Sequence, residues 1–387
     1  MSVGLRNKRI DLIRGVSIML VLLHHFNIVY RLSDTILARL FGWEAVQAVV
    51  RNGNYGVTMF FVISGFLITS NACNRWVDLG KLNARTFYSL RAARILPCLL
   101  LLLLVVDLLA VSGVSVFRNH AQSGGSPPSL WLANLAGLTF WMNVLIVHAG
   151  WFNYPLGVLW SLSVEEVFYV SFPIICLLLR RERLLVIFWA AIIIAGPIYR
   201  LMYQGSGDDF LYAYFACFDG IAIGCSAAVL ARRVALHGRT AQSLQIPVIA
   251  GMVSLYLYRP ISQSNVLGVT LMALGTAFLL LAANEHPSGP LLDRSRALAI
   301  LGWFGRFSYE LYLFHLIVLG AMRTMGPART VIGDEKLALL VVFLALSAAV
   351  SALIGYIWAA PLNRTIRRRL AADRSATGIA CISLALR

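Results

Sequence analysis

The sequence predicts an all-α, polytopic bundle of transmembrane helices, because its composition, its long apolar runs and the placement of its positive charges agree. Of its 387 residues, 59% are hydrophobic and 13% are charged, and the mean hydropathy is +0.77. A soluble domain normally has about a quarter of its residues charged. Apolar runs of roughly 20 residues are long enough to cross a bilayer. We therefore expect membrane lipid to surround most of the chain.

About ten such runs can be placed along the chain. The first follows basic residues but lacks a small-x-small cleavage site, so we expect a retained span and not a signal peptide. A shorter run, 130–147, is rich in tryptophan, which suits the headgroup region, so we expect it to be re-entrant or interfacial. The ten predicted spans are 12–30, 55–72, 94–112, 158–179, 184–203, 210–231, 244–258, 265–283, 308–325 and 337–360.

The positive charges predict how these spans are oriented. If the N-terminus is cytoplasmic, 24 of the 33 Lys and Arg residues fall on the cytoplasmic side. This bias follows the positive-inside rule and predicts that both termini are cytoplasmic. It also explains the net charge of +16 without nucleic acid, since the anionic inner leaflet attracts basic loops. We expect a membrane domain over 1–363 and a short basic cytoplasmic tail over 364–387.

The first span carries an arginine and two histidines, which hydrocarbon disfavours. Arg14 and His25 are eleven residues apart, so they share one helix face and lie about 16 Å apart along its axis. His24 points roughly 80° away from Arg14. Imidazole suits proton transfer near neutral pH, which makes His25 a functional candidate. The alternatives are an arginine that snorkels to the interface and a histidine that only hydrogen-bonds in the core.

Two further motifs lie on the next two spans. In "NYGVTMFFVISGFLI" (54–68), Gly65 is expected to allow close helix packing, as small residues commonly do in membranes. In "RAARILP" (91–97), Arg91 and Arg94 lie one turn apart at the cytoplasmic end of a span. They are either ordinary positive-inside anchors or a clamp for phosphates, which the planar guanidinium fits well.

The motif "LWSLSVEEVFY" (159–169) places Glu165 and Glu166 a few residues into an apolar run, where carboxylates are costly unless they face a partner or a wet cavity. We expect only one of the two to face the interior; Glu165 shares a face with Tyr169. In "FSYELYLFH" (307–315), Tyr312 and His315 continue one polar stripe that begins at Ser308. The stripe indicates either interhelical hydrogen bonding or a site that converges with His25.

The sequence shows no metal-ligand spacing and no glycine-rich nucleotide loop, so no metal site is expected. The six cysteines form no C-x-x-C pair and mostly fall within apolar runs, so we expect them to be core residues.

Taken together, these motifs resemble a known family. Arg14 through His25 resembles the arginine-x10-histidine signature of bacterial acyltransferase family 3, the integral-membrane acyltransferases that acylate surface polysaccharides. "GVTMFFVISGFLI", "RAARILP", "WSLSVEEVFY" and "FSYELYLFH" follow in that family's order. The resemblance runs from about residue 8 to 362 and implies a bacterial inner-membrane location.

The resemblance implies O-acyl transfer, commonly of acetyl, from cytoplasmic acyl-coenzyme A to a hydroxyl of a glycan or lipid-linked sugar outside. No permanently bound cofactor is expected. His25 would act as general base or carry the acyl group. Arg14 would hold donor or transition-state charge, and Glu165 is a third catalytic candidate. Arg91 and Arg94 would bind the phosphates of coenzyme A. The residues implied to bind substrate are Trp160, Ser161, Tyr169, Tyr312 and His315.

Two departures from the family pattern matter. Thr58 stands where the family often has an acidic residue, so any carboxylate role there is lost or supplied elsewhere. There is also no fused extracytoplasmic esterase-like domain in the sequence, so we expect the chain either to work alone or to pass the acyl group to a separate extracytoplasmic transferase.

The alternative function is a transporter or flippase in which His25, Glu165 and His315 form a proton relay. Transporters often show repeated halves with broken helices, and neither is evident in the sequence. A non-catalytic scaffold would leave the Arg14/His25 pair unexplained.

Overall fold

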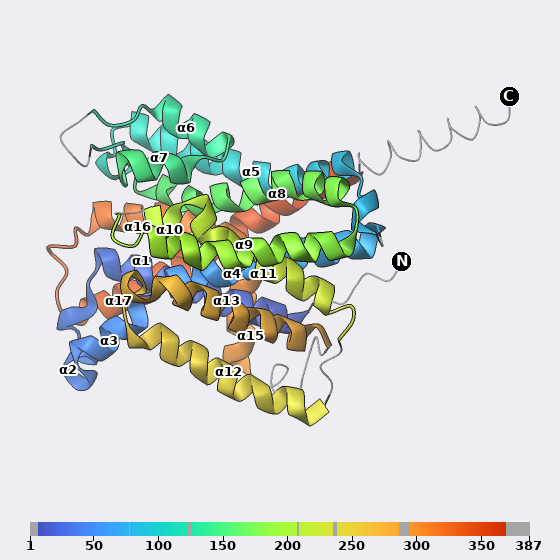
Figure 1. Cartoon of the computed structure of the whole chain (residues 1–387). Coiled ribbons are helices and arrows are strands. Elements are labelled where there is room, and N and C mark those ends of the chain that lie inside the picture. The colour runs from blue at the N-terminus through green and yellow to red at the C-terminus, as the bar shows by residue number, and fades with distance from the viewer. Residues whose placement is uncertain are drawn as a thin grey trace.

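The computed structural model describes residues 7–76, 78–121, 126–206, 209–234, 238–285 and 295–368 (Figure 1). Within these ranges every regular element is a helix and there is no strand, which confirms the all-α prediction. The long helices lie side by side (Figure 1). They are α1 (Lys8–Val29), α4 (Asn54–Trp76), α5 (Ala84–Val111), α8 (Leu159–Leu179), α9 (Glu182–Met202), α11 (Tyr214–Leu230), α12 (Gly238–Tyr258), α13 (Ile261–Glu285), α16 (Ser308–Met325) and α17 (Glu335–Leu353).

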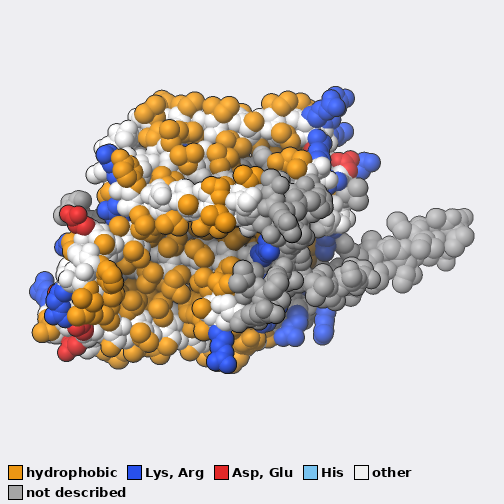
Figure 2. All heavy atoms as spheres, turned by 90° about the horizontal axis from the view of Figure 1, so that it is seen from below, with side chains coloured by type: hydrophobic (Ala, Val, Ile, Leu, Met, Phe, Trp, Pro, Cys, Tyr) orange, Lys and Arg blue, Asp and Glu red, His pale blue; other side chains and the backbone are white. Residues whose placement is uncertain are grey.

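Each of the ten predicted spans overlaps one of these helices, so the number of spans agrees approximately with the prediction. Among the described residues, seven segments are long and apolar enough to cross a bilayer, and α11 and residues 243–258 of α12 form shorter apolar helices. Figure 2 shows hydrophobic side chains over the middle of one face, with charged side chains gathered mostly toward its two ends. This is the pattern expected of a lipid-facing belt.

The two ends of the bundle differ. We call the end at which α1, α5, α9 and α16 begin the basic end, and the opposite one the far end. Short helices gather at the far end (Figure 1). These are α2 (Ile36–Phe41), α3 (Trp43–Val50), α6 (Leu130–Leu138), α7 (Met142–Ala149) and α10 (Asp209–Tyr212), with 3-10 turns at Leu32–Asp34, Ser115–Phe117 and Pro155–Val158.

The run at 130–147 does not form a span, as predicted. It folds into α6 and α7, of which the longer has 9 residues and extends about 14 Å, half of what a bilayer requires. The break between them is at Phe140, whose φ of 62° lies in the left-handed region that a helix excludes. The backbone carbonyl of Phe140 accepts a hydrogen bond from the hydroxyl of Tyr214 at 2.7 Å.

Glycines bring helix backbones into direct contact, and two of these contacts bear on the predictions. A Cβ atom on Gly65 of α4 would lie 2.1 Å from the carbonyl oxygen of Ile221 on α11, which confirms the packing role predicted for Gly65. The second contact involves α15 (Arg296–Arg306), a helix that the sequence analysis did not identify. A Cβ on its Gly305 would lie 1.7 Å from the carbonyl oxygen of Asp11, so α15 presses directly on α1.

The chain after α17 stays helical and returns toward the bundle at the basic end. A π-helical segment, Ile354–Ala359, follows α17, and the helix continues through the last described residue, 368. Within the π segment, the indole nitrogen of Trp358 donates to the carbonyl of Pro97 on α5 at 2.8 Å. The predicted boundary between membrane domain and tail, at 363/364, lies inside this helical stretch; residues 369–387 lie outside the described part of the chain.

Candidate active site

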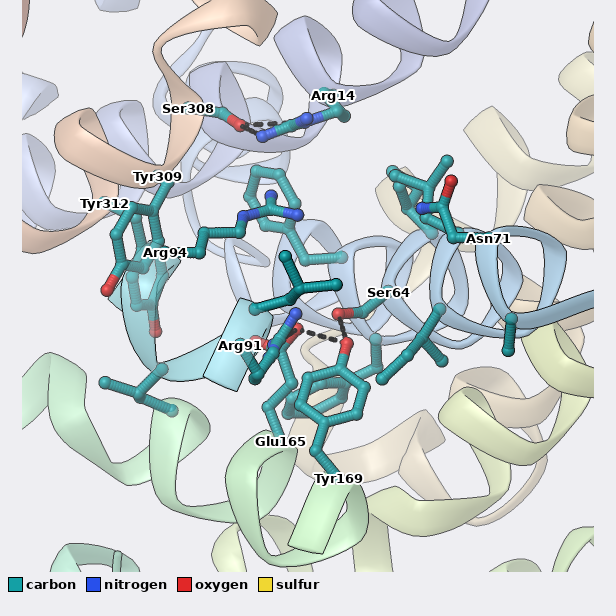
Figure 3. A pocket seen from close by; sticks show the side chains of 18 of the residues that line it. Arg14, Ser64, Asn71, Arg91, Arg94, Glu165, Tyr169, Ser308, Tyr309 and Tyr312 are labelled. Carbon is teal, nitrogen blue, oxygen red and sulfur yellow. Dashed lines mark hydrogen bonds and ion pairs between the residues drawn. The ribbon is translucent and has the colours of Figure 1, made fainter. Parts of the chain in front are cut away.

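A cavity of about 310 Å³ lies between α1, α4, α5, α8 and α16. One face of α4 lines it from end to end, since Val57, Ser64, Asn71 and Arg75 recur at helical spacing along its wall. From Val57 to Arg75 the helix rises about 27 Å, so the cavity is long and narrow and runs through most of a bilayer's thickness. Figure 3 shows side chains from several helices converging on this space.

The basic end of the cavity carries an unusual concentration of arginines. Arg75, Arg94 and Arg367 line it while remaining exposed, so they mark its mouth. In the described part of the chain, these three have no carboxylate partner. Such a mouth attracts anions, because clustered guanidinium groups present a strong local positive potential. The five arginines that line the cavity are Arg14, Arg75, Arg91, Arg94 and Arg367.

Arg14 lies on the cavity wall and contacts α16. Its Nε and Nη2 atoms donate to the hydroxyl oxygen of Ser308 at 3.0 and 2.8 Å (Figure 3). The guanidinium thus faces the neighbouring helix in the interior of the bundle, and this contact does not fit the snorkelling alternative. Because Ser308 is 1% exposed, the contact is held within packed protein.

Arg91 is not available as a simple phosphate clamp. Its Nη2 atom lies 2.9 Å from an oxygen of Glu166 and 3.3 Å from one of Glu165. The Arg91 guanidinium also stacks over the ring of Tyr169, 3.5 Å from the ring centroid. The Glu166 side chain is 5% exposed and that of Arg91 is 17% exposed, so the ion pair is largely removed from water. A buried guanidinium in this position mainly neutralises two carboxylates.

The Glu165–Glu166 pair corrects one expectation. We expected one carboxylate to face the interior, but both contact Arg91. Glu165 also accepts a hydrogen bond from the hydroxyl of Tyr169 at 2.8 Å, and that hydroxyl contacts the hydroxyl of Ser64 on α4 (Figure 3). We call Arg91, Glu165, Glu166 and Tyr169 the Arg91 cluster. It joins α5 to α8 along one wall of the cavity, opposite Arg14 and Ser308 in Figure 3.

The two histidines of α1 have different partners. His25 Nδ1 lies 3.1 Å from Nε2 of His315 on α16, and the two rings are 4.9 Å apart between centroids. His24 Nδ1 instead lies 3.1 Å from the backbone oxygen of Val50, at the end of α3. His25 therefore shares with Arg14 the face that contacts α16, which confirms the helical-face argument. The convergence expected of His25 and His315 is also confirmed.

Tyr312 separates the cavity from this histidine pair. Its ring lines the cavity, and its hydroxyl is 2.6 Å from the hydroxyl of Ser161 on α8. On the other side, the Tyr312 and His315 rings are 6.2 Å apart between centroids. Arg14 lines the cavity, whereas His25 lies beyond its far end and is not part of the lining. Arg14 and His25 thus lie on one helix face, as expected, but only Arg14 lines the cavity.

Trp160 faces away from the main cavity. It packs edge-on against Phe61 and Tyr212 and lines a second cavity of only about 20 Å³. That small cavity also borders Arg200, which forms an ion pair with Asp219 at 2.8 Å, both side chains being 0% exposed. Sequence reasoning missed this pair. Two ionisable residues inside predicted spans were a sufficient signal to look for it.

Two further predictions concern metal sites and the positions of the cysteines. Within the described ranges, no three His, Cys, Asp or Glu side chains are grouped as a metal site would require. The core position predicted for the cysteines is confirmed for the five that are described, which are free and buried; Cys381 lies outside the described residues.

Arg75 and Arg367 are cavity residues that sequence reasoning missed, because positive-inside anchoring accounted for them equally well.

Comparison with known proteins gives a consistent result. A family model described as an acyltransferase domain, that of acyltransferase family 3, matches residues 7–360. A Staphylococcus aureus (strain COL) protein, whose name assigns it provisionally to the O-acetyltransferases, is 25% identical over 331 residues. The peptidoglycan O-acetyltransferase OatA of Listeria monocytogenes (strain EGD-e) is 23% identical over 333 residues. Each alignment covers 80% of this chain and 50% or 49% of the relative. The chain thus spans about half the length of these curated relatives. No solved structure gives a significant match.

Proposed function

The chain belongs to acyltransferase family 3, and from this premise we propose that it is a transmembrane O-acyltransferase. It moves an acyl group, most simply acetyl, from acyl-coenzyme A to a hydroxyl on the other side of the membrane. The observation that carries the proposal is the long cavity with an arginine-lined mouth, whose far end meets Tyr312 beside the His25–His315 pair.

In this proposal the basic end of the bundle faces the cytoplasm of a bacterial cell, and the membrane is the inner one. The placement of 24 of 33 Lys and Arg residues supports this orientation, which puts the N-terminus and the last described helix on the cytoplasmic side. The cavity mouth then opens where acyl-coenzyme A is made. The histidine pair lies near the far end, because His25 is four residues from the end of α1.

The donor is a substrate and not a resident cofactor. Arg75, Arg94 and Arg367 would bind its phosphates at the mouth, and the narrow, mostly uncharged inner part would hold the pantetheine arm. Arg91 contributes to this chemistry indirectly, because its charge is taken up by Glu165 and Glu166. Arg14 lines the same cavity but is less exposed than the three mouth arginines, so it would meet charge that develops at the thioester.

The chemical step needs one base. His25 takes the proton of the acceptor hydroxyl while the oxygen attacks the thioester carbonyl; the carbon–sulfur bond breaks, and the proton returns to the departing thiolate. In the variant with an acyl carrier, a ring nitrogen of His25 attacks the thioester carbonyl and the coenzyme A thiolate leaves. The acceptor oxygen then takes the acyl group from His25, and the proton of its hydroxyl goes to the thiolate. Both variants require the thioester to pass Tyr312, so the Tyr312–Ser161 hydrogen bond at 2.6 Å would have to open.

The acceptor class is an extracytoplasmic glycan or lipid-linked sugar. The names of the relatives support this class, since one of them is a peptidoglycan O-acetyltransferase. A separate extracytoplasmic transferase as the immediate acceptor is part of the same proposal. The alternative of a proton-relaying transporter has less support, because Glu165 bonds to Arg91 and Tyr169 and not to the histidines.

Thioester turnover tests the proposal directly. Proteoliposomes containing the protein are supplied with acetyl-coenzyme A on one side and bacterial cell-wall glycan on the other, and free coenzyme A is measured with a thiol reagent. We expect acceptor-dependent release of coenzyme A and a matching acetyl mass on the glycan. Preparations that release none with any hydroxyl acceptor tried would reject an acyltransferase working alone.

The mouth arginines give a separate prediction about donor binding. Replacing Arg94 by glutamine should raise the donor KM about tenfold with little change in kcat, because one charge-assisted hydrogen bond to phosphate is lost. Arg75→Gln and Arg367→Gln should act in the same direction. Arg85→Gln is the matched control, since Arg85 is exposed on the same helix but does not line the cavity. Equal KM values for the Arg94 and Arg85 variants would contradict the assignment.

A further inference from the structure

We propose that His315 is a positioning residue that fixes the protonation of His25, so that the reactive lone pair of His25 lies on Nε2. The inference rests on the proposed function and adds to it: it identifies which nitrogen reacts and what holds it in that state. The inference is based on a chain of hydrogen bonds that runs from the backbone of α16 through His315 to His25.

The backbone of α16 determines the state of His315. Its Nδ1 atom lies 2.9 Å from the carbonyl oxygen of Leu311 and 2.9 Å from that of Tyr312. A carbonyl oxygen only accepts hydrogen bonds, so this nitrogen must carry a proton. The ring is 0% exposed, and no described carboxylate bonds to it, so a second proton would be a buried, uncompensated charge. The neutral ring with an unprotonated Nε2 is therefore favoured.

The state of His25 follows from that of His315. The unprotonated Nε2 of His315 is an acceptor 3.1 Å from Nδ1 of His25, so Nδ1 of His25 carries the proton and donates it. Nε2 of a neutral His25 is then left with the lone pair. In free imidazole both tautomers are populated, so a fixed acceptor at Nδ1 increases the fraction of His25 that can react through Nε2.

The same argument applies to both chemical roles left open for His25. A general base takes the acceptor proton on Nε2, and an acyl carrier forms its bond to the acyl carbon at Nε2. In each case Nδ1 of His25 keeps its proton and donates it to His315. By accepting this hydrogen bond, His315 stabilises the positive charge that His25 gains in the reaction. In this proposal His315 acts only through its hydrogen bond to His25 and is neither the base nor the nucleophile, which distinguishes positioning from catalysis.

Two amide substitutions test the inference. Asparagine at 315 places its amide where Nδ1 of the histidine was, so it can still bond the α16 carbonyls but falls one methylene short of His25. Glutamine reaches the position of Nε2 and can present an oxygen to His25. We expect His315→Asn to lower kcat roughly 100-fold at unchanged donor KM, and His315→Gln to stay within about tenfold of the parent.

Controls separate this inference from the proposed function. His24→Gln is the matched histidine variant outside the pair, because His24 bonds the backbone of Val50; it should keep the parental rate. If His25→Ala is inactive but His315→Asn and His315→Gln have equal rates, the positioning role is wrong and the proposed function stands. If His25→Ala stays active, the proposed function itself fails.

A second measurement covers the case in which the asparagine variant does not accumulate in membranes. In a His315→Ala background, His25 is replaced by Nδ1-methylhistidine, whose methyl group leaves the lone pair on Nε2 without help from a neighbour. We expect the methylated protein to recover kcat relative to the same background with ordinary histidine. No recovery, with both proteins eluting as single species in detergent, would overturn the inference.

Discussion

Alanine in place of His25 is expected to lower thioester turnover by about 10²- to 10⁴-fold, the usual contribution of a positioned general base, and by more if the residue carries the acyl group. The amount of protein in the membrane should be unchanged, because the imidazole is half-buried and its removal leaves only Nε2 of His315 without a partner, while Nδ1 keeps its backbone bonds. Coenzyme A release, normalised to protein eluting as a single species, measures the effect.

The adjacent histidine provides the matched control. His24→Ala removes a ring that bonds the backbone of Val50, so it should keep most of the rate. A dead His24 variant beside a fully active His25 variant would reverse the assignment. Radiolabelled acetyl-coenzyme A without acceptor also separates the two roles of His25: label retained on the parent but absent from His25→Ala indicates an acyl carrier, and no label indicates a base.

Helical periodicity alone identified the polar faces of α1 and α16 that contact each other. Eleven residues are close to three helical turns, so Arg14 and His25 had to share a face, and Ser308 and His315, seven apart, had to share another. The structure places these faces together, with Arg14 on Ser308 and His25 on His315. The spacing could not show that Tyr312 interrupts the space between the two contacts, because a side chain's direction across a cavity depends on its neighbours.

Contacts between segments that lie far apart in the sequence could not be predicted from local sequence patterns. Arg91 and Glu166 were both identified as unusual, but they are 75 residues apart, and either could have faced an anion, lipid headgroups or water. α15 was missed because 11 residues with a basic residue at each end do not form a recognisable span. Its place is set by contact between Gly305 and the backbone of α1, which no local pattern encodes.

The second large effect concerns the Arg91 cluster, where we expect a loss of stability instead of a loss of donor binding. Replacing Arg91 by methionine keeps much of the side-chain volume but leaves two carboxylates uncompensated, and the Glu166 side chain is 5% exposed. Breaking a buried ion pair by removing one partner typically costs about 3–5 kcal/mol. The variant should therefore show a much lower thermal unfolding temperature in detergent, or fail to accumulate at all.

Compensating substitutions distinguish a structural cluster from a phosphate site. In the Arg91→Met background, Glu165→Gln together with Glu166→Gln removes the unpaired charges, so the triple variant should recover a large part of the lost stability, because contacting residues are not additive. Arg94→Met, one turn away at the exposed mouth, should keep the parental unfolding temperature and only weaken donor binding. If Arg91→Met were as stable as the parent and raised the donor KM, Arg91 would be the phosphate ligand that the sequence suggested, and both glutamates would need another partner.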